Sequence, residues 1–154
     1  MQKSKFNSLI KEGFNHIPLS REIVVDTLTP LALYLKLANN PYSYFLESVQ
    51  GGEKWGRYSF IGLAAETVIK VNNYEVRVEK NGQLTQEYEV EDPLAWIEDY
   101  QNQFKVPQLD NLPDFNGGLV GYFGYEIVRY IEPKLAHINK TDELNVPDIL
   151  LMVS

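Results

Sequence analysis

Residues 67–90, TVIKVNNYEVRVEKNGQLTQEYEV, contain three consecutive strand candidates and decide the fold class of this chain. The candidates are residues 67–71, 74–80 and 86–90, which are short runs separated by turn residues. Asn81-Gly82 lies between the second and the third run, and both residues tolerate the positive φ that a tight hairpin turn requires. The stretch therefore predicts a meandering antiparallel sheet.

Further strand candidates lie on both sides of this stretch. Residues 42–47 and 57–63 precede it, and residues 146–154, VPDILLMVS, form a proline-started apolar run at the end of the chain. A strand this apolar normally lies between two neighbours. Because no polar tail follows Val153, we expect the chain to be the leading piece of a longer protein, divided at or near a domain boundary. The alternative is a complete small protein whose last strand enters its own sheet.

Two short helices are predicted from their N-terminal signals. Thr29 followed by Pro30 is typical of an N-cap and a first helical residue, and Asp92-Pro93 repeats the pattern. In the second helix the apolar residues recur on one face, at Leu94, Ile97, Tyr100 and Phe104. Residues 106–116 are expected to form a connecting loop. The fold class is α+β, an antiparallel β-sheet that is part of a sandwich-like fold, with a few short helices.

The composition excludes several classes of protein. The chain has 154 residues, 44% hydrophobic and 23% charged, which is typical of one globular domain. A net charge of -7 disfavours nucleic acid and anionic membranes as partners. The absence of cysteine excludes disulfides and thiolate metal sites, and His16 and His137 are too isolated to indicate a metal. With no signal-peptide core and no membrane-length apolar run, we expect a cytoplasmic protein.

Residues 46–62, LESVQGGEKWGRYSFIG, are a candidate small-molecule site. A zwitterionic amino acid with a flat side chain needs three kinds of partner. These are a cation or amides for its carboxylate, an anion or carbonyls for its ammonium, and an apolar wall for its ring. Arg57, Glu47 and the pair Tyr58 and Phe60 are residues of these types. The alternative is a strand, a glycine turn and a second strand, with Glu47 and Arg57 as an ordinary surface pair.

The same stretch, followed by residues 116–133, NGGLVGYFGYEIVRYIEP, closely resembles the N-terminal part of anthranilate synthase component I, the large subunit. The resemblance also covers IPLSREI at residues 17–23, TPLALYLKLAN at residues 29–39 and EDPLAWIEDY at residues 91–100. It implies the N-terminal part of the chorismate-utilising synthase fold. It further implies a lyase that converts chorismate and ammonia or glutamine to anthranilate and pyruvate, the first step of tryptophan biosynthesis.

Two alternatives to this family remain open. The large subunit of aminodeoxychorismate synthase, from the folate branch, shares the architecture. A stand-alone amino-acid-binding module is the alternative from a different class.

The resemblance also implies which parts of the enzyme these residues lack. We expect residues 1–154 to be a single N-terminal regulatory domain, without the C-terminal chorismate-binding catalytic domain. The Mg²⁺ site and the acid and base of the reaction belong to that second half, so no catalytic residue is assigned and the fragment alone is expected to be inactive. A glutamine amidotransferase subunit, component II, is the expected partner.

In this family the N-terminal half carries feedback inhibition by L-tryptophan, around a leucine-glutamate-serine sequence and a second strand. The matching residues are Leu46 with Glu47 and Ser48, and then Arg57, Tyr58, Ser59 and Phe60. The resemblance implies that Ser48 holds the polar end of the amino acid and that Glu47 favours the ammonium, directly or by orienting neighbours. Tyr58 or Phe60 would pack against the indole ring. Arg57 would either contact the ligand or pair with Glu47 or Glu53.

The glycines of residues 117–124 do not form a nucleotide-binding loop, because the spacing is wrong and no lysine with serine or threonine follows. Glycines in a strand indicate close approach of another backbone, and we expect this segment to line the contact with the absent half. After it, we expect Arg129 to form a structural pair with Glu126 or Glu132.

Overall fold

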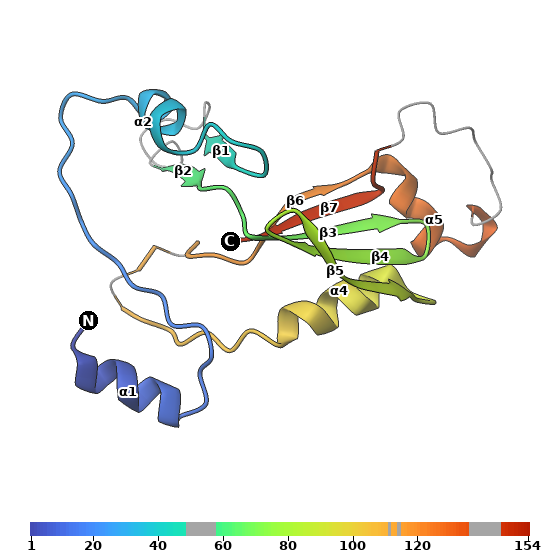
Figure 1. Ribbon diagram of the computed structural model, residues 1–154, viewed down its shortest axis with the longest axis horizontal. Helices are drawn as coiled ribbons and strands as arrows, with labels where there is room; N and C mark the ends of the chain where they lie inside the picture. The colour runs from blue at the N-terminus through green and yellow to red at the C-terminus, as the bar shows by residue number, and fades with distance from the viewer. Residues whose placement is uncertain (49–57, 111, 114, 136–145) are drawn as a thin grey trace.

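In the computed structural model, two antiparallel sheets and several short helices make up the part of the chain that is described, residues 1–48, 58–110, 112–113, 115–135 and 146–154 (Figure 1). The helices are α1 Lys3–Lys11, α2 Pro30–Leu37, α4 Pro93–Asn102, α5 Val128–Ile131, and the 3₁₀ turns η1 Tyr125–Ile127 and η2 Pro133–Leu135. The strands are β1 Tyr44–Glu47, β2 Ser59–Gly62, β3 Thr67–Asn72, β4 Glu75–Lys80, β5 Gln83–Glu89, β6 Leu119–Phe123 and β7 Ile149–Val153. The predicted α+β class, with antiparallel sheets and short helices, is confirmed.

The larger sheet has five strands in the order β5-β4-β3-β7-β6, and every neighbouring pair is antiparallel. β7 therefore lies between β3 and β6, which confirms that this apolar strand has neighbours on both sides. The strand lies within the predicted residues 146–154, but it begins at Ile149 and not at Val146. The strand order, which inserts the last strand beside the third, came from the structure.

The predicted hairpin turn between β4 and β5 is confirmed. Asn81 and Gly82 have φ values of 51° and 75°, as a two-residue turn of this kind requires. Lys80 then pairs directly with Gln83. The expected start of the third strand at residue 86 was therefore wrong, because a two-residue turn leaves residue 83 already opposite its partner.

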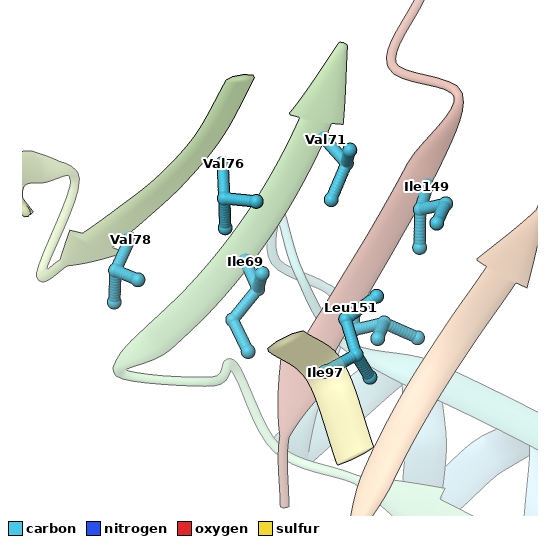
Figure 2. Close-up of a cluster of buried hydrophobic side chains, with 7 residues drawn as sticks. All are labelled: Ile69, Val71, Val76, Val78, Ile97, Ile149 and Leu151. Atoms are coloured by element: carbon cyan, nitrogen blue, oxygen red, sulfur yellow. The ribbon is translucent and has the colours of Figure 1, made fainter. Parts of the chain in front are cut away.

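The core lies on one face of the five-stranded sheet, where α4 covers it (Figure 2). Alternate residues of β3, β4 and β7 point to this face and meet Ile97 of α4: Ile69, Val71, Val76, Val78, Ile149 and Leu151. Asp92 caps the helix, since its side chain accepts hydrogen bonds from the backbone N–H groups of Leu94 and Ala95. The second helix is confirmed, with Leu94, Ile97 and Tyr100 at the core. Phe104, the fourth residue of the expected face, lies beyond the end of α4 at Asn102.

Gly121 of β6 and Gly124, which follows β6 directly, approach a neighbouring backbone closely, as predicted. A Cβ built on Gly121 would lie 1.9 Å from the carbonyl oxygen of Leu150, and one built on Gly124 would lie 3.0 Å from that of Asp148. The neighbour at these positions is β7 of the same chain. A contact of the segment with a further half of the protein is not tested by this geometry.

The N-terminal region contains a helix that the sequence did not indicate. α1 has no side chain that caps its N-terminus, and Leu9 is its single buried residue, so the usual start signal is missing. After α1, the side chain of Asn15 donates to the carbonyl of Gln103 at 2.7 Å and accepts from the N–H of Lys105 at 2.7 Å. Asn15 thus connects this region to the residues that follow α4.

In the described ranges, no helix is long and apolar enough to cross a membrane.

Candidate functional site

β1 and β2 pair as a two-stranded antiparallel sheet that carries most of the predicted site residues. Glu47 lies directly opposite Ser59, and the hydroxyl of Ser59 donates a hydrogen bond to the Glu47 carboxylate at 3.1 Å. The structure therefore brings together two of the predicted residues, and it gives Glu47 a partner on the neighbouring strand. Both side chains are accessible to solvent.

Tyr58 and Phe60 lie side by side, with ring centroids 6.1 Å apart and planes 26° from parallel. Phe60 also meets the edge of Phe115 at 5.0 Å, a contact with the loop before β6. Tyr58 is 56% exposed, so one end of this three-ring row is open to solvent. An aromatic wall of the expected kind is present.

The paired strands β1 and β2, called the hairpin below, separate the carboxylate of Glu47 from the aromatic wall of Tyr58 and Phe60. Successive side chains of a strand point to opposite faces, so Phe60 points away from the face that carries Ser59. Glu47 shares the face of Ser59, because residues directly opposite in an antiparallel pair point the same way. A ligand packed flat against Phe60 is therefore screened from Glu47 by the backbone of the hairpin.

Two of the predicted residues remain, Ser48 and Arg57. Ser48 follows β1 directly and is exposed. Arg57 lies outside the described residues, as do Glu53 and Gly51-Gly52, so the proposed partners of Arg57 remain predictions.

α2 supports the hairpin from the N-terminal side, and the sequence reasoning did not identify this contact. Tyr34 of α2 stacks on Phe45 of β1 at 5.6 Å, and its hydroxyl lies 3.2 Å from the Oγ of Ser43. Thr29 caps the helix as predicted, since its side chain accepts from the N–H of Ala32. The helical spacing of Tyr34 was visible in the sequence, but no local pattern pairs it with Phe45.

Two further contacts join the hairpin to the larger sheet. The Nζ of Lys70, on β3, lies 5.3 Å from the centre of the Tyr42 ring. Tyr44 covers Gly62, its partner across the hairpin, and its hydroxyl lies 2.7 Å from the Oγ of Ser154. A glycine opposite a tyrosine was a signal in the sequence, because an aromatic ring often covers a strand glycine. The partner at Ser154, by contrast, is 110 positions away.

A second polar cluster surrounds Asp148, immediately before β7. Its Oδ2 accepts hydrogen bonds from the Nη2 of Arg129 at 2.5 Å, the hydroxyl of Tyr130 at 2.7 Å and the backbone N–H of Asn73 at 2.7 Å. Burial alone would raise the pKa of Asp148, but these three donors outweigh it and hold the pKa below its ordinary value. Burial, together with the bond to Asp148, raises the pKa of Tyr130.

This cluster corrects the predicted pairing of Arg129. Neither Glu126 nor Glu132 pairs with it, and both are exposed. The prediction assumed a continuous helix, but α5 is one turn that follows the separate 3₁₀ turn η1. The guanidinium therefore extends across to Asp148, which lies 19 positions later in the chain.

A cavity lies apart from the hairpin face. It has a volume of about 580 Å³ and is formed where the segment after α1, the end of α4, the glycines before β6 and the end of β7 meet. Its lining combines apolar side chains with amides, as in Phe104, Leu119, Val153, Asn102 and Asn116. This volume falls within the range of small-molecule sites.

In the described part of the chain, no three histidine or acidic side chains lie close enough together to hold a metal ion. The most buried carboxylate of the two clusters, Asp148, is already occupied by three donors.

The chain is similar along its whole length to curated proteins named anthranilate synthase component 1. Those of Pseudomonas putida and Pseudomonas aeruginosa are each 53% identical to it over 154 residues, and that of Aquifex aeolicus is 37% identical over 146 residues. These alignments cover 100%, 100% and 94% of this chain, and 31%, 31% and 29% of the respective relatives. The chain thus spans about a third of the length of these relatives. No family model matches the sequence.

Proposed function

Because the chain is homologous over its whole length to the N-terminal third of anthranilate synthase component 1, we propose that it forms the N-terminal part of such an enzyme and carries its site for L-tryptophan. The enzyme would convert chorismate, with ammonia or glutamine, to anthranilate and pyruvate. A magnesium ion and the reacting groups would lie in the further part of the polypeptide. A second component, a glutamine amidotransferase, would supply the ammonia, and the word component in the names of the relatives supports such a partner.

The observation that carries the tryptophan proposal is the aromatic row on the hairpin. Tyr58, Phe60 and Phe115 form a wall with one open end, and an indole ring stacked there would bury apolar area against a half-exposed tyrosine. Continuing the register of β1 and β2 by one pair would set Ser48 opposite Tyr58, on the same face. Ser48 would then hydrogen-bond the polar end of the amino acid.

The geometry favours the indirect role for Glu47. Its carboxylate accepts the hydroxyl of Ser59 on the opposite face from Phe60, so it would stabilise the hairpin that presents the wall. Arg57 would bind the carboxylate of the ligand as a planar, permanently charged donor.

Inhibition requires that tryptophan bind one conformation of the enzyme more tightly than another. We propose that the tryptophan-bound conformation is the one with a poorly formed chorismate site. Stacking together with charge-assisted hydrogen bonds would reach micromolar affinity, about -8 kcal/mol.

Calorimetric titration of L-tryptophan, with L-phenylalanine as the control ligand, tests the site in this chain. We expect saturable binding that is selective for tryptophan and is weakened at least about tenfold by Phe60→Leu, which removes the central ring of the wall. Tyr88→Leu is the matched control. Tyr88 lies on β5 of the larger sheet, is also half-exposed, and packs against the ring of Trp96 on α4.

Equal loss of binding in both variants would contradict the assignment to the hairpin. If this chain does not bind tryptophan, the same titration on the full-length protein separates two explanations. Binding there would show that the further part of the polypeptide completes the pocket, and its absence would refute the tryptophan site.

The aminodeoxychorismate synthase alternative is disfavoured by the relatives, which are named anthranilate synthase component 1. Identification of the product that the full-length enzyme forms from chorismate and ammonia decides between them. Anthranilate lacks the pyruvyl carbons that aminodeoxychorismate retains, so mass spectrometry distinguishes the two products directly.

A further inference from the structure

β6 is an edge strand of the five-stranded sheet, and it bonds to β7 on one side. Two backbone hydrogen bonds give the phase of this pairing. The N–H of Gly118 donates to the carbonyl of Ser154 at 3.1 Å, and the N–H of Gly124 donates to that of Asp148 at 2.7 Å. These two glycines are six positions apart, so the even-numbered positions between them share their phase.

The odd-numbered residues of β6 therefore direct their backbone groups outward. In an antiparallel pair, residues that bond to the neighbour alternate with residues that face away from it. Val120 and Tyr122 bond to β7, whereas the N–H and C=O groups of Leu119, Gly121 and Phe123 face the free side of the sheet. Within the described residues, no backbone hydrogen bond satisfies that side.

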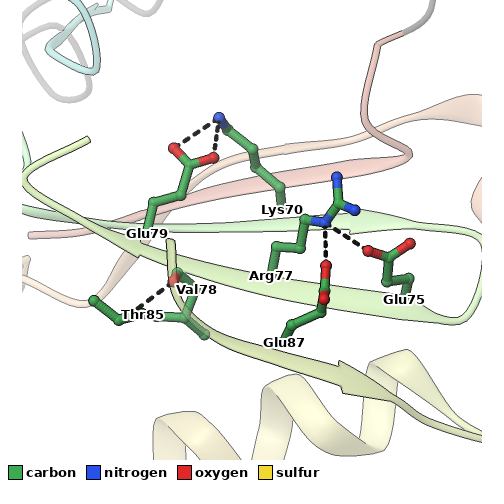
Figure 3. A network of polar contacts seen from close by, with 7 residues as sticks. All are labelled: Lys70, Glu75, Arg77, Val78, Glu79, Thr85 and Glu87. Carbon is green, nitrogen blue, oxygen red and sulfur yellow. Dashed lines mark hydrogen bonds and ion pairs between the residues drawn. The ribbon is translucent and has the colours of Figure 1, made fainter. Parts of the chain in front are cut away.

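β5 and β6 lie at the two opposite edges of the sheet (Figure 1), and among the described residues the two edges differ in their protection against further pairing. β5 carries acidic side chains, and Glu87 pairs with Arg77 of β4 at 2.7 Å (Figure 3). A register shift between Val78 and Glu79 also bends this edge. Charges and bulges are the usual means by which proteins keep an edge strand from pairing with another strand.

β6 has neither device. Its sequence, LVGYF, contains no charged residue, and its pairing with β7 is regular over all five positions. Tyr122 and Phe123 are 40% and 50% exposed, one on each face of the sheet. The strand begins beside the cavity of about 580 Å³, whose lining includes Asn116, Gly118 and Val153. Leu119 belongs to both, because it is the first residue of β6 and lines the cavity.

We propose that β6 is an internal strand of the full-length protein and that a strand from the further part of the same polypeptide pairs with its outer side. This inference rests on the proposed function, because the relatives continue for about twice the length that this chain covers. An extended segment is the occupant that matches open N–H and C=O groups at strand spacing. One end of the pairing segment would fill the cavity, because the amides and apolar side chains there suit a polypeptide better than a charged metabolite.

Amide hydrogen exchange of the full-length protein, resolved to single residues by mass spectrometry, tests this pairing. The amides of Val120 and Tyr122 are internal controls, because they are hydrogen-bonded to β7 in this chain. We expect the amides of Leu119, Gly121 and Phe123 to be protected to the same extent as these controls, and at least about 100-fold more than the exposed amides of β5.

Rapid exchange at the three outward amides, with Val120 and Tyr122 protected, would overturn the proposal. Protection that disappears when the full-length protein is diluted would also overturn the proposal, because it would indicate pairing between two copies of the chain. Anthranilate formation is measured on the same sample. A protected edge in a protein that makes no anthranilate would refute the proposed function and leave the strand pairing intact.

Discussion

Asp148→Asn is the substitution that tests the tertiary structure most directly, because one carboxylate oxygen accepts hydrogen bonds from three donors on two separate segments. Tyr130 and Arg129 come from α5, and the N–H of Asn73 comes from the turn between β3 and β4. Asparagine keeps the shape of the side chain and removes its charge. The substitution therefore leaves the half-buried guanidinium of Arg129 without the carboxylate that pairs with it.

The expected loss of stability follows from this geometry. Hydrogen bonds to a charged group contribute about 1.5–3 kcal/mol each, and breaking a buried ion pair costs about 3–5 kcal/mol. The amide oxygen of asparagine can still accept one or two of the three bonds. We therefore expect the free energy of unfolding to fall by about 3 kcal/mol, which corresponds to a melting temperature lower by roughly 6–12 °C for a chain of this size.

Urea unfolding followed by circular dichroism measures this difference, and its pH dependence gives a second test. The pKa of Asp148 lies below its ordinary value of 3.8 in the folded state, so the carboxylate stabilises the fold above that pH. Its contribution is lost as the pH falls through the folded-state pKa. The difference in stability between wild type and Asp148→Asn should be full at neutral pH and should shrink below about pH 4.

Glu126→Gln and Glu132→Gln are the matched controls, because these carboxylates are the helical neighbours first expected to pair with Arg129. Each should change the free energy of unfolding by less than about 0.5 kcal/mol, as exposed substitutions usually do. If either control destabilises the protein as much as Asp148→Asn, Arg129 pairs within its own helix and the reasoning is refuted. An Asp148→Asn variant as stable as wild type would refute it equally.

Two further predictions concern β6 and the hairpin. Gly121→Ala should lower the free energy of unfolding by about 3 kcal/mol, because the new Cβ would lie 1.9 Å from the backbone oxygen of Leu150 and the two strands must separate. Thermal unfolding measures this loss, and an unchanged melting temperature would contradict the register of β6 against β7. Ser48→Phe in the full-length enzyme should raise the tryptophan concentration for half-inhibition at least about tenfold and leave uninhibited turnover nearly unchanged. Assays of anthranilate formation check this, and unchanged inhibition would remove Ser48 from the site.

Most of the secondary structure could be predicted, since its signals lie within a few residues of one another. Asn81-Gly82 sets a turn through its own backbone angles, and Thr29 and Asp92 cap helices through bonds to N–H groups two or three positions later. α1 could not be predicted by the same reasoning, because its N-terminus has no capping side chain.

The residues of the candidate site were visible in the sequence, but the faces on which they lie were not. Their role in binding an amino acid stays a prediction. The sequence placed Glu47 and Phe60 in one short stretch, which suggested a shared pocket. The observed register puts Glu47 opposite Ser59, and a shift of one residue would have exchanged the faces. Register depends on how two strands align, so the composition of the stretch contains little information about it.

The sequence by itself determined where the strands, turns and caps lie, because each depends on the backbone preferences of a residue or on bonds to its near neighbours. Tertiary structure decided the contacts between distant segments. Arg129 meets Asp148, Tyr44 meets Ser154, and β7 enters between β3 and β6. The physical reason is that the choice of partner depends on the order of strands in the sheet. That order is set by the total apolar area that all the strands and α4 bury together.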